Sequence, residues 1–277
     1  MRKFVPGLAF GLFVLGGVGF AQSTAGLNIT VEENNGFITI TKCRGFVREV
    51  VIPDRINDMP VTAIGDFAFA KKDLAAVTIP DTVTRIGNGA FAENRLVEVT
   101  IGDNVTALGR GAFANNRLAR VTIGAGITVL ERGVFQVNNL TQVEIPQTVT
   151  AIEDYAFFNN RLVSITIPSG VTLVGEGAFS GNRITTLEIG AVAKIGDGAF
   201  YNNELTRVTI PDGVEDVGAR AFNNRPRSDS FARRVNYFDA REKLLFSSDE
   251  SFDTYYNSQG RKSGVYVYAD GAWSING

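Results

Sequence analysis

The chain has 277 residues, 44% of them hydrophobic, which is the composition of a folded protein and not of a disordered or collagen-like one. Its 27 lysines and arginines nearly balance 29 acidic residues, so the net charge of −2 gives no indication of nucleic acid or other strong polyanions as partners. Histidine is absent, which excludes serine–histidine–aspartate and cysteine–histidine catalytic systems and removes the commonest transition-metal ligand.

Residues 1–21 form the first predicted element, a secretory signal peptide. Two basic residues precede an apolar run over residues 5–20, and small residues occupy the −3 and −1 positions of a cut before Gln22. An uncleaved membrane anchor is the alternative, but the run is shorter than the roughly 20 residues that a spanning helix needs and contains Pro6. No second apolar run of spanning length follows, so we expect an exported chain with no transmembrane segment after signal cleavage.

The single cysteine, Cys43, excludes an intramolecular disulfide. It lies well beyond the predicted cut, so it is not positioned to carry a lipid anchor. A buried apolar role and an interchain disulfide are both open to it, and we favour burial because free cysteine behaves as a small hydrophobe.

Residues 22–60 are predicted to cap the start of the fold. Residues 28–31 and 37–41 alternate apolar and polar side chains, and the pair Asn35-Gly36 between them favours the tight turn of a β-hairpin. The first unit after this hairpin carries five extra residues around Arg55 to Pro60 compared with the later units, which predicts a protruding loop.

Residues 61–225 repeat a unit of 22 residues, with a single unit of 21. A phenylalanine column keeps this period at Phe69, Phe91, Phe113, Phe135, Phe157, Phe179, Phe200 and Phe222. A second column consists of Leu74, Leu96, Leu118, Leu140, Leu162, Ile184 and Leu205. A repeat of this kind predicts a solenoid, in which each unit packs only against its neighbours and the stacked columns form one continuous core.

One unit, residues 83–104, shows how each coil of the chain is expected to run. An alternation of apolar and polar residues places Val99 and Ile101 on one face of a short strand. A second extended piece opens the unit, and residues 87–92 can form one helical turn that directs Phe91 inward. We therefore predict stacked coils of about 22 residues with parallel short β-strands and single helical turns, closed by hairpin caps at both ends.

The recurring residues resemble those of the bacterial surface leucine-rich-repeat class typified by BspA-like proteins, especially its treponemal members. The unit carries the pattern Ile86-Gly87, Ala90-Phe91, Asn94, Leu96, Val99 and Ile101. Many members place a cysteine and two further residues before the leucine, whereas here an asparagine stands two residues before it. The amide of that asparagine can satisfy inward-pointing backbone groups and repeat as a ladder. The resemblance implies a leucine-rich-repeat solenoid with a surface interaction role, such as adhesion.

Residues 226–277 have a different, aromatic-rich composition and are predicted to form a C-terminal cap or tail. Val265 to Ser274, around Asp270-Gly271, reads as a second hairpin. Two roles are open to its aromatic residues: burial against the last coil, which we favour because a solenoid needs a cap, or a ligand-binding face. That alternative face consists of Tyr255, Tyr256, Tyr266, Tyr268 and Trp273.

A column of arginines directly follows the asparagine column and is the candidate ligand-binding edge. Its members are Arg95, Arg117, Arg161, Arg183 and Arg225. Coils about 4.8 Å apart would align these side chains along one edge. We favour local pairing with acids such as Glu93, Glu98 or Glu153, with the stems covering apolar surface. The sharper hypothesis is bidentate binding of an acidic partner, a sulfated glycan or a carboxylate-rich protein face.

The sequence predicts a binding protein and not an enzyme, with no catalytic, cofactor-binding or metal-binding residues. Acidic pairs such as Glu153-Asp154 are adjacent, whereas a glycosidase needs two carboxyls held across a cleft. The expected location is secreted, cell-surface or periplasmic, and the expected partner is a protein or acidic glycan, such as host extracellular matrix. A structural or assembly scaffold of the cell envelope is the alternative function, and a carbohydrate-active enzyme is the least favoured one.

Overall fold

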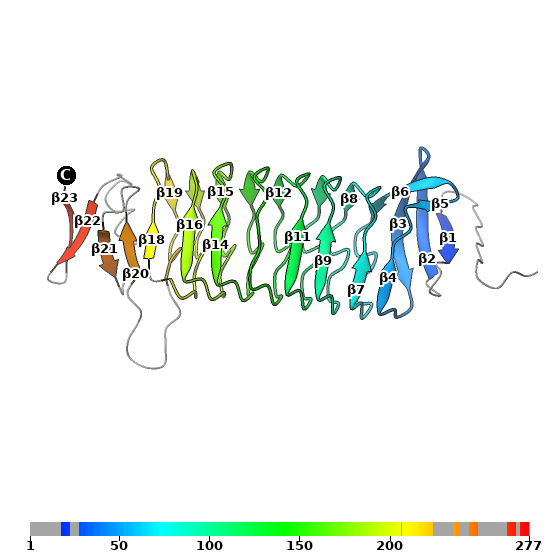
Figure 1. Ribbon diagram of the computed structural model, residues 1–277, viewed down its shortest axis with the longest axis horizontal. Coiled ribbons are helices and arrows are strands. Elements are labelled where there is room, and N and C mark those ends of the chain that lie inside the picture. Colours follow the sequence, from blue (N-terminus) through cyan, green and yellow to red (C-terminus); the bar gives the residue numbers. More distant parts are fainter. Residues whose placement is uncertain are drawn as a thin grey trace, which may run out of the picture.

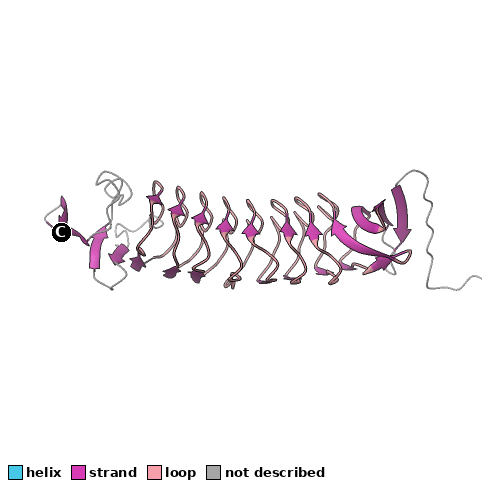
Figure 2. Cartoon of the chain, turned by 90° about the horizontal axis from the view of Figure 1, so that it is seen from above, coloured by secondary structure: helices cyan, strands magenta, loops and turns pink. Residues whose placement is uncertain are grey.

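The chain forms a row of stacked coils with a β-sheet cap at its N-terminal end (Figure 1). This computed structural model describes residues 18–22, 28–205, 207–223, 235–238, 244–248, 265–269 and 272–276. Within those ranges the regular elements are strands joined by turns, and no helix occurs (Figure 2). The solenoid predicted from the 22-residue period is confirmed.

The N-terminal cap is an antiparallel sheet of β1 (Val18–Gln22), β2 (Asn28–Asn34) and β3 (Phe37–Arg44). The turn between β2 and β3 has positive φ at both Asn35 (51°) and Gly36 (80°), as the tight turn of a twisted hairpin requires. This confirms the first predicted hairpin. Strand β3 also pairs in parallel with β6 (Met59–Ile64), so the cap continues into the first coil through backbone hydrogen bonds.

The five extra residues of the first unit, expected to form a protruding loop, form a second, very short hairpin. Strand β5 (Arg55–Ile56) pairs antiparallel with the start of β6. Asn57 and Asp58 connect the two strands, both with positive φ, a conformation that asparagine and aspartate tolerate better than most residues.

Most coils contribute one short strand to each of two sides of the solenoid, whereas residues 142–145 form no strand on the long-strand side. The short-strand side consists of β6, β8 (Arg85–Ile86), β10 (Ala107–Leu108), β12 (Val129–Leu130), β13 (Ala151–Ile152), β15 (Leu173–Val174), β17 (Lys194–Ile195) and β19 (Asp216–Val217). The long-strand side consists of β4 (Glu49–Val51), β7 (Ala76–Thr78), β9 (Glu98–Ile101), β11 (Arg120–Ile123), β14 (Ser164–Ile167), β16 (Thr186–Ile189) and β18 (Arg207–Thr209). Within each side the paired strands run parallel, with a register that follows the repeat.

Toward the C-terminus, β18 pairs in parallel with β20 (Val235–Phe238), which pairs antiparallel with β21 (Leu244–Ser248). Strands β22 (Val265–Ala269) and β23 (Ala272–Asn276) form a separate antiparallel pair. The predicted C-terminal hairpin is therefore present in the backbone.

The phenylalanine column forms the centre of the hydrophobic core. The rings from Phe69 to Phe200 are fully buried, and Phe222 is 2% exposed. Successive rings stack nearly parallel, with centroids 5.2–5.9 Å apart and interplanar angles of 3–21°. This separation is close to the spacing of neighbouring β-strands, so each ring rests on the ring of the next coil.

The segment that directs each phenylalanine inward consists of β-turns, where the sequence led us to expect a helical turn. In one coil, the N–H of Ala90 donates to the carbonyl of Gly87 (3.3 Å) and the N–H of Ala92 donates to that of Gly89 (3.0 Å). Gly89 lies in the left-handed region (φ 55°), which a right-handed helical turn does not allow. Two consecutive turns thus replace the helical turn, while Phe91 is buried as expected.

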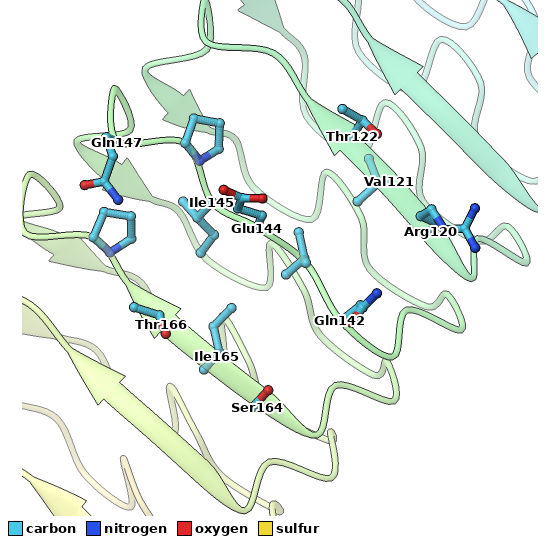
Figure 3. A pocket seen from close by; sticks show the side chains of 13 residues that line it. Arg120, Val121, Thr122, Gln142, Glu144, Ile145, Gln147, Ser164, Ile165 and Thr166 are labelled. Atoms are coloured by element: carbon cyan, nitrogen blue, oxygen red, sulfur yellow. The ribbon is translucent and has the colours of Figure 1, made fainter.

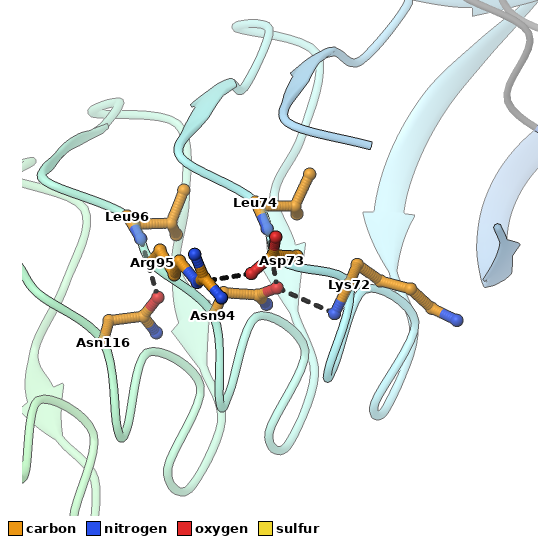
Figure 4. A network of polar contacts seen from close by, with 7 residues as sticks. All are labelled: Lys72, Asp73, Leu74, Asn94, Arg95, Leu96 and Asn116. Carbon is orange, nitrogen blue, oxygen red and sulfur yellow. Dashed lines mark hydrogen bonds and ion pairs between the residues drawn. The ribbon is translucent and has the colours of Figure 1, made fainter. Parts of the chain in front are cut away.

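The asparagine column forms the predicted ladder in the same bend of each coil, three residues after the phenylalanine (Figure 4). The side-chain oxygen of Asn94 accepts hydrogen bonds from the N–H groups of Lys72 (2.9 Å) and Leu74 (3.1 Å). Its amide nitrogen donates to the carbonyls of Phe69 (2.7 Å) and Phe91 (3.0 Å). Equivalent bonds recur at Asn116, Asn138, Asn160, Asn182 and Asn203, all of them buried. Each amide therefore connects its own coil with the preceding one.

Cys43 takes the place of the phenylalanine column in the cap. Its N–H donates to the carbonyl of Ala68 (2.7 Å), as the N–H of Phe69 donates to that of Ala90 (2.8 Å). The side chain is fully buried, which confirms the expected burial. Burial raises the pKa of the Cys43 thiol, and the charge of Lys72 opposes this effect.

We therefore predict that Cys43 is unreactive in the native protein, because the thiolate is the attacking species and both burial and a raised pKa suppress it. Alkylation by iodoacetamide at neutral pH, followed by intact-mass analysis, should be slow in buffer and fast in denaturant. Rapid labelling of the folded protein would contradict this assignment.

Candidate functional site: the arginine edge

Four arginines of the predicted edge occupy equivalent positions in their coils. Arg95, Arg117, Arg161 and Arg183 are all exposed, and each follows a buried asparagine of the ladder. Their N–H groups donate to the carbonyls of Leu74, Leu96, Leu140 and Leu162 in the preceding coils, at 2.8–3.0 Å. The backbone of the edge is therefore fixed in register. Asn139 and Glu204 interrupt the column, and the fifth candidate, Arg225, lies outside the described residues.

From the sequence we favour local pairing of the arginines with nearby acids. The structure shows such a pair for one of these four arginines, and its acid is not one of those that we named. Arg95 pairs with Asp73, its Nε lying 2.5 Å from Oδ1 (Figure 4). Glu93 pairs instead with Lys71 (3.1 Å), and Glu98 pairs with Arg120 (3.5 Å) on the long-strand side.

Among the residues that the structure describes, Arg117, Arg161 and Arg183 form no ion pair. The positive charge of the edge is therefore concentrated beyond its first member. Sequence spacing places the arginines on one edge correctly, but it does not indicate which of them are neutralised by acids.

A small hollow opens on this edge between Arg161 and Arg183. It has a volume of about 180 Å³, and its lining also includes Asn159, Gly181 and Glu204. Gly181 stands in a column that carries side chains in neighbouring coils, including Asn159 and Asn202. All three residues have positive φ, at 73°, 55° and 60° respectively. The missing side chain at Gly181 thus leaves space beside Arg161 and Arg183, a feature that the sequence analysis did not identify.

A larger hollow of about 620 Å³ lies on the long-strand side (Figure 3). Residues 142–145 run between β11 and β14 there but pair with neither strand. Pro146 ends this segment, and Pro168 ends β14. At the equivalent position of the next coil, the N–H of Gly190 donates to the carbonyl of Ile167 (3.0 Å), a bond that a proline cannot form because it lacks the N–H. The ladder therefore loses a hydrogen bond at each of these two prolines.

The lining of this larger hollow is mostly polar, and its charged members are one arginine and one glutamate. Arg120, Thr122, Gln142, Glu144, Ser164 and Thr166 contribute exposed side chains. Arg120 pairs with Glu98, and the hydroxyl of Thr166 donates to the carboxylate of Glu188 (3.0 Å). Two of its polar groups are thus already engaged within the protein, so it is a weaker ligand-site candidate than the arginine edge.

The acidic groups near the turns have structural contacts. Asp154 accepts a hydrogen bond from the N–H of Glu176 (2.9 Å). The hydroxyl of Tyr155 donates to the Glu176 carboxylate, and this bond raises the pKa of Tyr155, so the phenol stays neutral. Within the described ranges, no group of three or more cysteine, aspartate or glutamate residues is arranged to hold a metal ion.

The alternative aromatic face lies only partly within the described part of the chain. Tyr255 and Tyr256 are not described, whereas Tyr266 and Tyr268 lie in β22 and Trp273 lies in β23. Tyr268 and Trp273 are opposite each other in the strand register. Nowhere among the described residues is there a helix long and apolar enough to cross a membrane.

Comparison with known proteins supplies a family for this architecture. The family model of the BspA type leucine rich repeat region matches residues 62–185 and 175–252 with six copies. A leucine rich cell surface protein from Faecalibacterium prausnitzii A2-165 is similar in structure, with 27% identity over 84% of this chain and 78% of that chain and a TM-score of 0.48.

Two further solved structures show a similar arrangement. A leucine-rich repeat protein from Bacteroides ovatus ATCC 8483 is 20% identical over 84% of this chain and 72% of that chain, with a TM-score of 0.45. A leucine rich repeat protein from T. pallidum is 20% identical over 69% of this chain and 78% of that chain, with a TM-score of 0.32. No curated protein sequence matches the chain.

Proposed function

Because the chain belongs to the BspA type leucine rich repeat family, we propose that it is an exported, non-enzymatic binding protein that acts at the cell surface or after release. It binds a protein or an acidic glycan, such as a component of the host extracellular matrix, and so mediates adhesion or protein–protein interaction. The observation that carries this proposal is the set of Arg117, Arg161 and Arg183, which have no acidic partner within the described residues.

Such an edge suits ligand binding for two physical reasons. Guanidinium groups are planar and weakly hydrated, so they form bidentate contacts with carboxylate or sulfate groups. The backbone beneath them is held by hydrogen bonds between coils, so little conformational freedom is lost when a ligand binds.

Replacing Arg95, Arg117, Arg161 and Arg183 together with serine tests this function. We expect the wild-type protein to capture matrix proteins or heparin at low salt, with weaker capture at physiological salt, and the variant to lose most of this capture. Circular dichroism should confirm that the variant is folded. Unchanged capture by the variant, or salt-independent capture by the wild type, would show that the arginine edge does not bind the ligand. The aromatic tail would then be the candidate binding site.

Export makes a separate prediction about the N-terminus. The mature protein should begin at or near Gln22, so intact-mass analysis of the exported chain should show a loss of about residues 1–21. Such cleavage would also remove most of β1 and leave that edge of β2 unpaired. Exported protein that retains Met1 would contradict the prediction.

A further inference from the structure

The hollow at Gly181 is the most specific feature of the arginine edge. Arg161 and Arg183 lie in adjacent coils, whose stacked rings Phe157 and Phe179 have centroids 5.2 Å apart. Two exposed cationic side chains are therefore attached to neighbouring coils without an acid between them. Like charges on neighbouring coils repel each other, and an anionic group placed between them would relieve that repulsion.

The backbone around the hollow is fixed by contacts between coils. The N–H of Gly181 donates to the carbonyl of Tyr201 (2.9 Å), and the N–H of Asn159 donates to that of Ser180 (2.8 Å). Directly beneath them, the amides of Asn160 and Asn182 bond to the carbonyl of Phe157 at 3.2 and 3.0 Å. The walls of the hollow are thus held in place before any ligand arrives, which favours binding by reducing the entropy lost.

We propose that this hollow binds a carboxylate of an acidic protein segment, with Arg161 and Arg183 contacting it from both sides. The proposal rests on the proposed function and names the ligand chemistry of its edge. A second carboxylate beside the first, two residues along a strand or one turn along a helix, would lie roughly 5–7 Å away and reach the outer side of one arginine.

The composition of the rim favours an acidic protein over a densely sulfated glycan. Glu204 lies on the rim, where its negative charge opposes a densely sulfated chain, whereas a protein segment can place an uncharged part of its backbone there. The side chain of Asn159 adds a group that both donates and accepts hydrogen bonds. Asn139 and Glu204 also break the arginine column, so the edge lacks the unbroken positive charge that a sulfated chain would need.

Two substitutions separate the two parts of the proposal. Arg161→Gln combined with Arg183→Gln removes the charges and leaves the hollow. Gly181→Asn fills the hollow and leaves the charges, and asparagine already occupies this positive-φ column at Asn159 and Asn202. The added Cβ would approach Asn159 no closer than 3.5 Å, so we expect the variant to fold. Arg48→Gln combined with Arg85→Gln is the charge-matched control, because both arginines are exposed and form no ion pair among the described residues.

The experiment is a calorimetric titration of the full chain and these variants with an oligo-glutamate peptide, an oligo-glutamine peptide of equal length, and a heparin oligosaccharide. We expect the wild type and the control to bind the oligo-glutamate peptide and not the oligo-glutamine peptide. Both test variants should bind it about tenfold more weakly or worse, since each loses charge-assisted contacts or the space for them.

Equal oligo-glutamate affinity in all variants, or no binding of this peptide by the wild type, would overturn the proposal. Stronger binding of heparin that is lost in the same variants would overturn the assignment to an acidic protein in favour of a sulfated glycan. If the wild type does not bind oligo-glutamate but still captures matrix proteins, the proposed function stands and its ligand binds elsewhere on the surface.

Discussion

Replacing Phe135 or Phe157 with alanine is expected to lower the free energy of unfolding by roughly 3–5 kcal/mol, the range for a fully buried phenylalanine. Each ring stacks on two neighbours, with the centroids of Phe135 and Phe157 5.5 Å apart and those of Phe157 and Phe179 5.2 Å apart. Removing a central ring therefore leaves a cavity bordered by coils on both sides, which the rigid ladders hinder from collapsing.

Urea denaturation followed by circular dichroism measures this effect. Phe222→Ala is the matched comparison, because Phe222 stacks on Phe200 at 5.5 Å near the C-terminal end of the column, and it should cost less. A midpoint for both central variants within error of the wild type would show that the phenylalanine column does not hold the coils together.

Replacing Asn160 with leucine is expected to destabilise the protein by about 3 kcal/mol or more, although the two side chains are similar in size. The Asn160 oxygen accepts from the N–H of Leu140 (3.1 Å), and its nitrogen donates to the carbonyls of Phe135 (2.9 Å) and Phe157 (3.2 Å). The substitution leaves these buried backbone groups without partners, at about 1–3 kcal/mol each with incomplete additivity.

The neighbouring Asn159 provides the control. It is exposed, its side chain makes no hydrogen bond within the described part of the chain, and its positive φ of 55° suits glycine. Asn159→Gly should therefore change the urea midpoint little. Equal effects of the two substitutions would show that the buried ladder contributes no more than an exposed turn residue.

The sequence is sufficient to predict the stacking, because the residues that stack recur. Phe91 has equivalents in all eight coils and Asn94 in six of them, at a spacing of 22 residues with a single 21, so a chain that buries one of them buries its equivalents in columns. The inward-facing amide of Asn94 also follows from local chemistry, since a buried amide needs partners that the turn backbone supplies.

The turns are less predictable, because their conformation depends on the coils on either side. Val137 and Tyr155 have positive φ of 54° and 57°, which neither side chain favours by itself. The N–H of Val137 donates to the carbonyl of Phe158 (2.8 Å), and that of Tyr155 donates to the carbonyl of Glu176 (2.8 Å). Neighbouring coils therefore impose a backbone conformation that local propensity disfavours.

The candidate site divides in the same way. The arginine edge is predictable because Arg95, Arg117, Arg161 and Arg183 keep the period of the core beneath them. The acids that pair with these arginines are not predictable from the sequence, because the pairing of Arg95 with Asp73 depends on how far each side chain reaches between coils. The hollow at Gly181 depends on one missing side chain, whose effect is evident only beside Asn159 and Asn202.

The central claim, that the solenoid meets its partner outside the cell, is tested most directly by labelling intact cells with a membrane-impermeant amine reagent. Lys71 and Lys194 report on the solenoid, since their side chains are 69% and 60% exposed. Peptide mass spectrometry should show both lysines labelled to the same extent in intact and in lysed cells, while a periplasmic marker protein is labelled only after lysis. Labelling of Lys71 and Lys194 that appears only after lysis would contradict the account and favour a scaffold inside the cell envelope.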